Sequence, residues 1–451
     1  MPTSNKQKEP ICALATPAGK GAVAIVRLSG KGAHAIAEKI THKKLTAREA
    51  SYTNFYNQNG ELLDQGLVIY FQTPASFTGE DIVEFHCHGN PLVADVLLKT
   101  LCAYGARLAT PGEFSLRAFL NNKIDLAQAE AIADLINSTT EQGARTATKS
   151  LQGAFSQRVE NVLAELIKLR MNIEAHLDFP DEEIDRQQSQ QLEKQLTTLK
   201  LSLAELLQQA KLGERLQTGA TVAIAGRPNA GKSSLLNVLA QSEVAIVTEI
   251  PGTTRDPLSA DIEIQGIAVR FIDTAGLRDT QDVIEAKGIE RAQHALSTAD
   301  LVLWLSDATD EEQEPPAHLD ATKVILVLNK IDLQSAANSK QDGSIKISAK
   351  TKTGIDNLIK HLALRLHGPE NAIKDVCQEG GDTPFLARNR HVVALQQTQK
   401  NIQSAQQHLK ENLELSAEEL RVAQQRLGEI TGEFTPDDLL GKIFSEFCIG
   451  K

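Results

Sequence analysis

The sequence predicts a multidomain α/β protein: an N-terminal α+β domain, then a helical-bundle domain interrupted by an inserted domain with a mostly parallel sheet. Short apolar runs rich in β-branched residues cluster between residue 10 and about residue 120. Two helical tracts, 122–217 and about 386–428, flank a central segment. That segment opens with a strand, a glycine-bearing loop and a helix, which is the setting of a phosphate-binding loop.

The N-terminal region carries alternating strand and turn signals. Apolar runs at 11–14 and 23–28 predict two strands separated by a Pro-Gly turn, and the runs at 66–71 and 81–88 predict two more. The leucines and valines of 92–104 recur at helical intervals and predict a helix. A mixed α/β domain follows from this order.

Several polar residues interrupt these apolar strands, namely Arg27, Glu84 and the pair His86 and His88. A His-x-His pair can bind a metal ion. No further ligand lies nearby in the sequence, so a strand end with one or two exposed imidazoles is the favoured interpretation.

The two helical tracts each show one apolar face. In the first tract, Val159, Leu166 and Ile173 mark a helix that ends near the acidic segment 179–185, and a second helix runs to about Leu212. Because each face needs a partner, one helical domain with a compact insertion explains the pattern better than four consecutive domains. The run Asp181-Glu182-Glu183 in this segment could be a metal or partner site, but a solvated loop and helix start is the favoured interpretation. The expected domain boundaries are 1–121, 122–217, 218–373 and 374–451.

Composition limits the class of protein. The 451 residues carry a net charge of -11, so a nucleic-acid partner would have to use local basic patches. Five scattered cysteines suit a reducing cytosol rather than a disulfide framework. The start of the chain is polar, and no apolar run is long enough to span a bilayer. A soluble, cytoplasmic protein is therefore expected.

The central segment fits the pattern Gly-x-x-x-x-Gly-Lys-Ser from Gly226 to Ser233, after the apolar strand 221–225. Backbone N–H groups of such a loop, together with the helix N-terminus that follows, can face a phosphate chain. Lys232 is expected to reach the outer phosphates, and the Ser233 hydroxyl is expected to bind Mg²⁺.

Two further motifs complete a phosphate and Mg²⁺ site. Asp273-Thr274-Ala275-Gly276 ends an apolar strand, where the carboxylate can hold the Mg²⁺ water shell and Gly276 can meet the terminal phosphate. Gly252-Thr253-Thr254 lies between the first two motifs, where a switch loop is expected to supply Thr254 as a second Mg²⁺ ligand.

The last two motifs predict the base. Asn329-Lys330-Ile331-Asp332 ends another strand, and Asp332 can accept hydrogen bonds from N1–H and the 2-amino group of guanine. Adenine offers neither, so a buried Asp332 left unpaired would disfavour ATP. The backbone of Ser348-Ala349-Lys350 can support the guanine carbonyl. Five motifs in this order predict a P-loop GTPase domain with helices on both faces of its sheet. The residues predicted to contact GTP are Asn229, Ala230, Gly231, Lys232, Ser233, Ser234, Thr248, Glu249, Ile250, Pro251, Gly252, Thr253, Thr254, Asp273, Thr274, Ala275, Gly276, Asn329, Lys330, Asp332, Ser348, Ala349 and Lys350.

One position departs from Ras-like GTPases, which place a water-orienting glutamine directly after the Asp-x-x-Gly motif. Here that position is Leu277, which cannot orient water. Hydrolysis then needs another carboxylate and another positive charge. Glu285, Asp279 and Asp282 are candidates from the residues alone, and a solvated acidic loop would account for all three.

With these motifs in view, the chain resembles the MnmE (TrmE) family of bacterial tRNA-modification GTPases, nearly from end to end. The segments that carry the resemblance, besides the GTPase motifs, are Ala15-Thr16-Pro17-Ala18-Gly19-Lys20-Gly21, Phe77-Thr78-Gly79-Glu80-Asp81, Thr110-Pro111-Gly112-Glu113-Phe114, Asp125-Leu126-Ala127-Gln128-Ala129-Glu130-Ala131 and Phe447-Cys448-Ile449-Gly450-Lys451.

The resemblance implies a GTPase domain inserted into the helical domain, and a folate-binding-like N-terminal domain that mediates homodimerisation. It also implies a heterotetramer with the FAD-dependent partner MnmG. The complex would install a carboxymethylaminomethyl or aminomethyl group at C5 of the wobble uridine of certain tRNAs. The one-carbon unit would come from a tetrahydrofolate derivative, 5-formyl- or methylene-tetrahydrofolate. The implied folate contacts are Arg27, Glu84, Lys123 and Lys451.

The resemblance further implies that K⁺ acts as a fixed positive charge beside the phosphates. The matching positions are Asn229, Thr248, Ile250 and Thr253, and the family's catalytic acidic residue aligns with Glu285. Pro251 would stiffen the switch loop.

Cys448 is, from the residues alone, a small apolar residue of the tail. The resemblance favours a reactive thiol there.

A rival function is a ribosome-assembly or switch GTPase without modification chemistry. The terminal Cys448-Ile449-Gly450-Lys451 and the folate-type N-terminal domain argue against it. An ATP-dependent enzyme is disfavoured by Asp332.

Overall fold

The chain folds into two compact units. One comprises Met1–Ala133, Val159–Ile167 and Leu420–Lys451, and the other comprises Asp134–Arg158 and Lys168–Glu419. The computed structural model describes residues 9–178, 186–241, 259–274, 294–309, 315–316, 319–333, 343–367, 385–409, 412–433, 437–445, 447 and 450.

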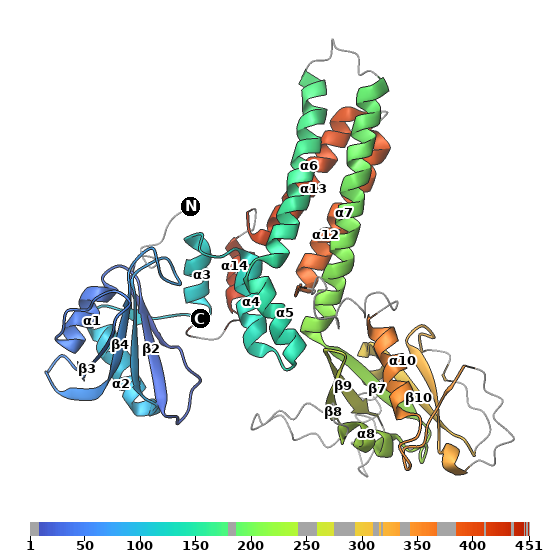
Figure 1. The fold of residues 1–451 in the computed structure, drawn as a ribbon, viewed down its shortest axis with the longest axis horizontal. Helices are drawn as coiled ribbons and strands as arrows, with labels where there is room; N and C mark the ends of the chain where they lie inside the picture. Colours follow the sequence, from blue (N-terminus) through green and yellow to red (C-terminus); the bar gives the residue numbers. More distant parts are fainter. Residues whose placement is uncertain are drawn as a thin grey trace. The chain divides into compact units, whose positions relative to one another are not determined.

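The first unit contains a six-stranded sheet in the order β3-β4-β5-β2-β1-β6 (Figure 1). Neighbouring strands are antiparallel except β1 and β6, which are parallel. Three of the four predicted strands agree with observed strands to within one residue, and the fourth covers the second half of β4. The strands are β1 (Ile11–Leu14), β2 (Val23–Ser29), β3 (Ala50–Tyr56), β4 (Leu62–Phe71), β5 (Ile82–His88) and β6 (Arg107–Leu108).

Helices α1 (Ala33–Thr41) and α2 (Pro91–Ala103) share a core cluster with this sheet. Asn90 caps α2 by accepting a hydrogen bond from the Leu92 N–H, and Pro91 occupies the first turn, where its missing N–H costs nothing. Successive side chains of a strand point to opposite faces. The buried Val26 and Leu28 of β2 therefore leave Arg27 on the other face of the sheet.

A second cluster in the same unit joins helices from both ends of the chain. Helices α3 (Glu113–Leu120), α4 (Leu126–Asn137) and α14 (Asp437–Ser445) contribute to it. The rings of Phe444 and Phe447 are tilted against each other, with centroids 5.3 Å apart, and both are buried. Helix α14 and Phe447 are thus part of the packed structure of this unit.

Long helices dominate the second unit beyond its sheet. They are α5 (Glu141–Leu151), α7 (Arg186–Thr218) and α12 (Asn389–His408), together with most of α6 (Ala154–Asp178) and the first residues of α13 (Leu413–Thr431). Val159–Ile167 of α6 and the part of α13 from Leu420 onward belong to the first unit. Asn172 of α6 donates to Gln195 of α7 at 3.1 Å, and Asn401 of α12 donates to Glu419 of α13 at 2.6 Å. The leucine face predicted for the second helix is buried, which confirms it: Leu192, Leu196, Leu199, Leu203, Leu206 and Leu207. The acidic segment 179–185 lies outside the described residues.

The second unit also contains a six-stranded sheet in the order β12-β11-β10-β7-β9-β8, parallel throughout except for the pair β8 and β9. Its strands and the helices beside it are β7 (Ala220–Gly226), α8 (Lys232–Ala240), β8 (Ser259–Ile264), β9 (Ile267–Asp273), β10 (Leu301–Asp307), β11 (Val324–Asn329), the 3₁₀ turn η2 (Ile331–Leu333), β12 (Ile345–Lys346) and α10 (Ile355–His367).

Both faces of this sheet are covered. Helices α8 and α10 pack on one face in a large apolar cluster. On the other face, Ala225 and Val302 contact Leu296 of the helical segment 294–298. The predicted fold class, an α+β domain plus a helical domain interrupted by a mostly parallel P-loop domain, is confirmed. Within the described ranges, no helix is both long and apolar enough to cross a membrane.

Candidate functional site

The phosphate loop connects the end of β7 to the start of α8, as the motif requires. Gly226 has φ 144°, and a Cβ there would lie 2.2 Å from the Leu305 carbonyl oxygen. Gly231 has φ 91°, and a Cβ there would lie 2.3 Å from Nδ2 of Asn329. Only glycine fits either position, because the loop backbone packs directly against the end of β10 and against Asn329.

Lys232 and Ser233 begin α8 beneath this loop. The buried Lys232 donates from Nζ to the carbonyl oxygens of Gly226 at 2.9 Å and Arg227 at 2.7 Å. The Ser233 hydroxyl donates to Oδ2 of Asp273 at 2.6 Å. The structure therefore brings together the two oxygen-bearing side chains that the sequence assigned to Mg²⁺ and its water shell. Oxygen donors of this kind suit Mg²⁺.

The carboxyl end of β11 and the loop that follows β12 form the region predicted to bind the guanine base. Asn329 is buried, donates from Nδ2 to the Ala230 carbonyl at 2.9 Å, and accepts from the Ala349 N–H at 3.0 Å. The Ser348 hydroxyl donates to Oδ1 of Asp332 at 2.6 Å. Asn329 thus ties the phosphate loop to the Ser-Ala-Lys loop. Asp332 itself is exposed.

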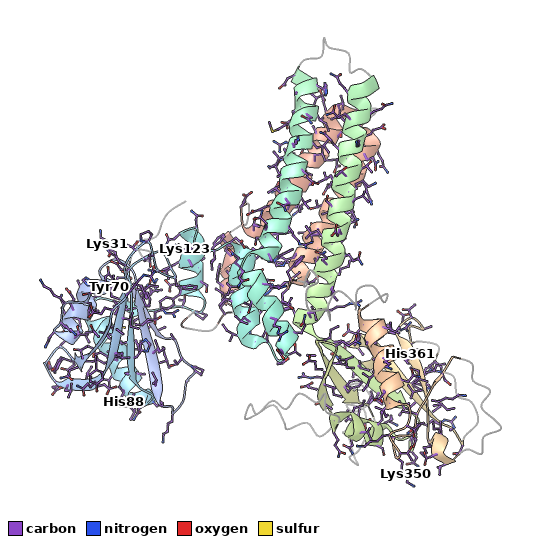
Figure 2. The ribbon with its side chains drawn as sticks, in the orientation of Figure 1. Lys31, Tyr70, His88, Lys123, Lys350 and His361 are labelled. Carbon is purple, nitrogen blue, oxygen red and sulfur yellow. The ribbon has the colours of Figure 1, made fainter. Side chains whose placement is uncertain are left out.

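The remaining described residues of the motifs lie close to these contacts in the chain. Thr274 follows Asp273, and its hydroxyl donates to the Ile224 carbonyl at 2.9 Å, which holds the end of β9 against β7. Asn229 adopts φ 65° within the phosphate loop. Lys350 is exposed at the end of the Ser-Ala-Lys motif (Figure 2). Ser234 is exposed in the first turn of α8.

The sequence analysis missed Asp307, which ends β10 beside β11. Its Oδ2 accepts from Nζ of Lys330 at 2.5 Å. The position was open to prediction, because a carboxylate at the carboxyl end of a parallel strand lies at the edge where ligands bind in α/β sheets.

Several predicted site residues lie outside the described residues, so the structure places none of them. They are Thr248, Glu249, Ile250, Pro251, Gly252, Thr253, Thr254, Ala275, Gly276, Leu277, Asp279, Asp282, Glu285, Cys448 and Lys451.

In the first unit, Arg27 and Glu84 lie opposite each other on β2 and β5. Arg27 donates from Nε to Oε1 of Glu84 at 2.9 Å and from Nη1 to the Gly450 carbonyl at 3.5 Å. Its guanidinium also lies 5.8 Å from the ring centroid of Phe77 and 5.7 Å from that of Phe114. Two of the predicted folate contacts are therefore paired with each other, and the C-terminal Gly450 lies beside them.

Lys123, the third predicted folate contact, follows α3 (Figure 2). Its Nζ donates to the Pro74 carbonyl at 3.1 Å, and Pro74 belongs to the same loop as Phe77.

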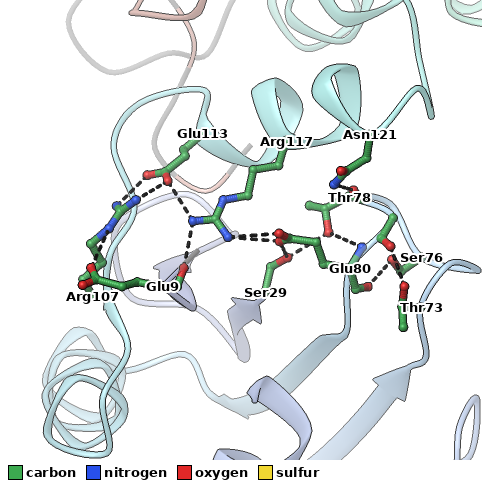
Figure 3. Close-up of polar contacts among 11 residues, drawn as sticks. Glu9, Ser29, Thr73, Ser76, Thr78, Glu80, Arg107, Glu113, Arg117 and Asn121 are labelled. Atoms are coloured by element: carbon green, nitrogen blue, oxygen red, sulfur yellow. Dashed lines mark hydrogen bonds and ion pairs between the residues drawn. The ribbon is translucent and has the colours of Figure 1, made fainter. Parts of the chain in front are cut away.

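A polar network holds that loop (Figure 3). Arg117 donates to Glu80 at 3.0 Å and to Glu113 at 3.1 Å, while Ser29 contacts Thr78 at 2.8 Å. Burial raises the pKa of Glu113, but hydrogen bonds from Arg107, the Thr110 backbone and Arg117 outweigh it and lower that pKa to about 2. Glu113 is thus a buried carboxylate that stays ionised because it is fully paired.

The His-x-His pair shows no metal-site geometry. His88 is exposed and its Nδ1 lies 2.7 Å from Oδ1 of Asp64, while Nε2 of His86 lies 3.7 Å from Oε2 of Glu84. Among the residues that the structure describes, no group of three His, Cys, Asp or Glu side chains could hold a metal ion.

Two family models match the chain. The model described as GTP-binding protein TrmE N-terminus matches residues 10–123, and the model described as MnmE helical domain matches residues 126–448. Among solved structures, Era from Aquifex aeolicus is 26% identical and covers 40% of this chain and 66% of its own, with a TM-score of 0.25. This TM-score is too low to support any statement about the family of the chain.

Curated relatives with the name tRNA modification GTPase MnmE match almost the whole chain. The relative from Nitrosomonas eutropha is 47% identical and covers 99% of this chain and 100% of its own. The relatives from Histophilus somni and Pseudomonas fluorescens are each 48% identical over 98% of this chain. The match spans 100% of the Histophilus somni protein and 99% of the Pseudomonas fluorescens protein. Because the identity extends over all the parts whose geometry is described above, the chain belongs to the MnmE (TrmE) family.

Proposed function

We propose that this protein is a GTP hydrolase that acts in tRNA modification. The observation that carries the proposal is the set of contacts made by Asn329 and Ser233. Asn329 joins the phosphate loop to the Ser-Ala-Lys loop, and Ser233 pairs with Asp273. These contacts lie in a chain that matches proteins named tRNA modification GTPase over nearly its whole length.

The chain's own residues have distinct roles in binding GTP. The loop backbone and Lys232 would bind the phosphates, Ser348-Ala349-Lys350 and Asp332 the guanine, and Ser233 with Thr254 the Mg²⁺ ion. When bound, Mg²⁺ supplies positive charge that offsets the charge developing on the phosphate oxygens. The pairing of Ser233 with Asp273 at 2.6 Å supports this assignment, because both offer the hard oxygen atoms that Mg²⁺ prefers.

We further propose that K⁺ activates hydrolysis, and that Glu285 orients the attacking water. Asn229 is the one described member of the proposed K⁺ set, and support comes from its place within the phosphate loop, beside which the ion would have to bind. Thr248, Ile250 and Thr253 would complete the set. Equal rates of GTP hydrolysis in K⁺ and Na⁺, or full activity of Glu285→Ala, would remove this part of the proposal.

The N-terminal unit is proposed to bind a tetrahydrofolate derivative through Arg27, Glu84, Lys123 and Lys451. Support comes from the Arg27–Glu84 pair, which offers donors and acceptors on one sheet face beside the C-terminal Gly450. A folate carboxylate can pair with a guanidinium, and a pterin amino group can donate to a carboxylate. Unchanged affinity for 5-formyl-tetrahydrofolate in Arg27→Ala would contradict this assignment.

At the level of the complex, we propose a cytoplasmic homodimer that joins the FAD-dependent MnmG in a heterotetramer and modifies C5 of the tRNA wobble uridine. Domains 1–121, 122–217, 218–373 and 374–451 are the proposed divisions, and Cys448 is a proposed reactive thiol. Size-exclusion chromatography with light scattering, with and without MnmG, tests the assembly. A monomeric mass that does not change when MnmG is added would contradict the proposed assembly.

The rival function is a ribosome-assembly or switch GTPase. Nucleoside analysis of total tRNA separates the two, using a strain that lacks this gene and the same strain complemented with it. Loss of the modified wobble uridine that returns on complementation supports tRNA modification. Unchanged tRNA nucleosides, with altered ribosome profiles, would favour the rival.

A further inference from the structure

Strands β10 and β11 lie side by side, and each ends in a polar residue at the carboxyl edge of the parallel sheet, where ligands bind in α/β folds. In the parallel register, Asp307 pairs with Asn329. Lys330 follows Asn329 directly, and the Ala308 N–H donates to the Asn329 carbonyl at 2.8 Å. The two chain segments are therefore fixed to each other by backbone bonds at the point where Asp307 meets Lys330.

Both oxygens of the Asp307 carboxylate accept hydrogen bonds. Oδ2 accepts from Nζ of Lys330 at 2.5 Å, and Oδ1 accepts from the N–H of Thr309 at 2.9 Å and from its hydroxyl at 2.8 Å. The side chain of Asp307 is 12% exposed and that of Lys330 is 32% exposed. Burial raises the pKa of Asp307, but the bonds from Lys330 and Thr309 outweigh it, so the carboxylate stays ionised at neutral pH.

The Lys330 side chain is restrained at its backbone end and at its ammonium end. Its backbone adopts φ 65°, in the left-handed region that few residues other than glycine occupy. Its ammonium group is bound to Asp307, so the four-carbon stem between them cannot sample most of its rotamers. A lysine side chain otherwise loses much conformational entropy when a ligand immobilises it. A stem fixed in advance avoids that loss when a flat purine packs against it.

We propose that Asp307 is a positioning residue of the guanine-nucleotide site: it fixes Lys330 so that the lysine stem is ready to flank the base. The inference rests on the proposed function, because it needs a nucleotide at this site. Asp307 has no role in the chemistry at the phosphates, so its effect is on nucleotide affinity and not on the rate of hydrolysis.

The chain contains a matched control. Asp307-Ala308-Thr309 and Asp320-Ala321-Thr322 have the same residue types and the same turn: Oδ1 of Asp320 accepts from the Thr322 N–H at 2.9 Å and from its hydroxyl at 2.6 Å. Asp307→Asn and Asp320→Asn therefore perturb the same local turn, but only the first removes the carboxylate that binds Lys330. A third variant, Lys330→Met, keeps a long stem and removes only the ammonium group.

The experiment measures the dissociation constants of GDP and GTP, together with kcat and KM for GTP, for the full-length protein and these variants. Asp307→Asn and Lys330→Met are expected to weaken the binding of both nucleotides by about tenfold with kcat within about twofold, because the released lysine stem then loses conformational entropy when the base immobilises it. Asp320→Asn is expected to match wild type. The double variant Asp307→Asn/Lys330→Met is expected to be no worse than either single variant, because the two changes remove one interaction.

Unchanged affinity in Lys330→Met would overturn the inference even if Asp307→Asn does not fold. Additive losses in the double variant would also overturn it, since they would show that Asp307 acts on the fold and not through Lys330. A wild-type protein that binds neither GDP nor GTP would contradict the proposed function itself, whereas wild-type binding with equal binding by Asp307→Asn contradicts only this inference.

Discussion

The backbone conformation and close packing of Gly231 exclude a side chain, which the substitution Gly231→Ala can test. Gly231 has φ 91°, and an added Cβ would lie 2.3 Å from Nδ2 of Asn329, the amide that holds the phosphate loop. Gly231→Ala is expected to displace Asn329 and to weaken GDP and GTP binding by more than about tenfold, because backbone strain and a steric clash act together. Calorimetric titration with GDP measures the effect.

The control for this change is Gly441→Ala, at a helical position in α14 where an added Cβ meets nothing within 4 Å. This variant should bind GDP as wild type does and be slightly more stable. Equal GDP affinity of Gly231→Ala and wild type would contradict the described loop geometry.

Glu113 gives a prediction about pH. Its lowered pKa, about 2 in the folded state, means that it stabilises the N-terminal unit at pH values above its ordinary pKa near 4.5. This stability is lost as the pH falls from about 4.5 toward 2. Glu113→Gln removes the buried carboxylate that Arg107 and Arg117 share and is expected to cost about 3 kcal/mol at pH 7, although Arg117 keeps its ion pair with Glu80.

Urea unfolding at pH 7 and pH 3 tests the sign of this prediction. The difference between wild type and Glu113→Gln should be large at pH 7 and clearly smaller at pH 3. Glu141→Gln, which changes an exposed carboxylate paired with Arg145, is the control and should have little effect at either pH. A difference that does not change with pH would contradict the low pKa.

Single residues also mark the limit of prediction from sequence. The phosphate loop, Asp273 and Asn329 follow from motif spacing, since each motif stands at a strand end. The partner of a side chain does not follow from spacing. The contact between Asp307 and Lys330 depends on β10 lying beside β11, and the pairing of Arg27 with Glu84 depends on the register between β2 and β5. Strand order and register are set by the whole sheet.

At the scale of elements, α5 is attached to the segment that returns from the central domain. Ser150 is buried on α5, accepts from the Leu386 N–H at 2.8 Å and donates to the Leu386 carbonyl at 3.3 Å. Phe155 and Phe385 stack beside it with centroids 4.6 Å apart. Ser150 and Phe155 thus help to hold the segment before α12 in place.

Ser150→Ala is expected to destabilise the second unit by about 1–2 kcal/mol, because it leaves a buried N–H and carbonyl without their partner. Urea unfolding followed by circular dichroism measures the change. Thr148→Ala is the control, since its hydroxyl donates to the Ala144 carbonyl on the exposed side of the same helix. Equal stabilities of the two variants would contradict a buried role for Ser150.

Elements with a continuous apolar pattern were predicted well. Strand β1 and helix α2 agree with their apolar runs, and so does the leucine face of α7. Strand β3 was missed, because its residues Ala50–Tyr56 are mostly polar or half exposed and only Ser51 and Phe55 are buried. Helices α1 and α3 were missed because they are short and follow glycines rather than side-chain caps.

At the scale of the whole chain, the inserted domain is the feature that sequence reasoning found most directly. The two helical tracts each present an apolar face, and the structure joins them through Ser150 and Leu386, which are 236 residues apart in the chain.

The central claim is that the inserted domain hydrolyses GTP and selects guanine through Asp332. Asn at this position keeps one acceptor for N1–H and adds a donor, which suits the 2-oxo group of xanthine and not the 2-amino group of guanine. The most direct measurement is therefore steady-state hydrolysis of GTP, XTP and ATP by wild type and Asp332→Asn, with Asp356→Asn on the exposed start of α10 as the control.

Wild type and Asp356→Asn should hydrolyse GTP, with much slower hydrolysis of ATP and XTP. Asp332→Asn should lose about a hundredfold or more in kcat/KM for GTP and gain activity on XTP. Equal GTP hydrolysis by Asp332→Asn and wild type, or wild-type hydrolysis of ATP as fast as GTP, would contradict the account.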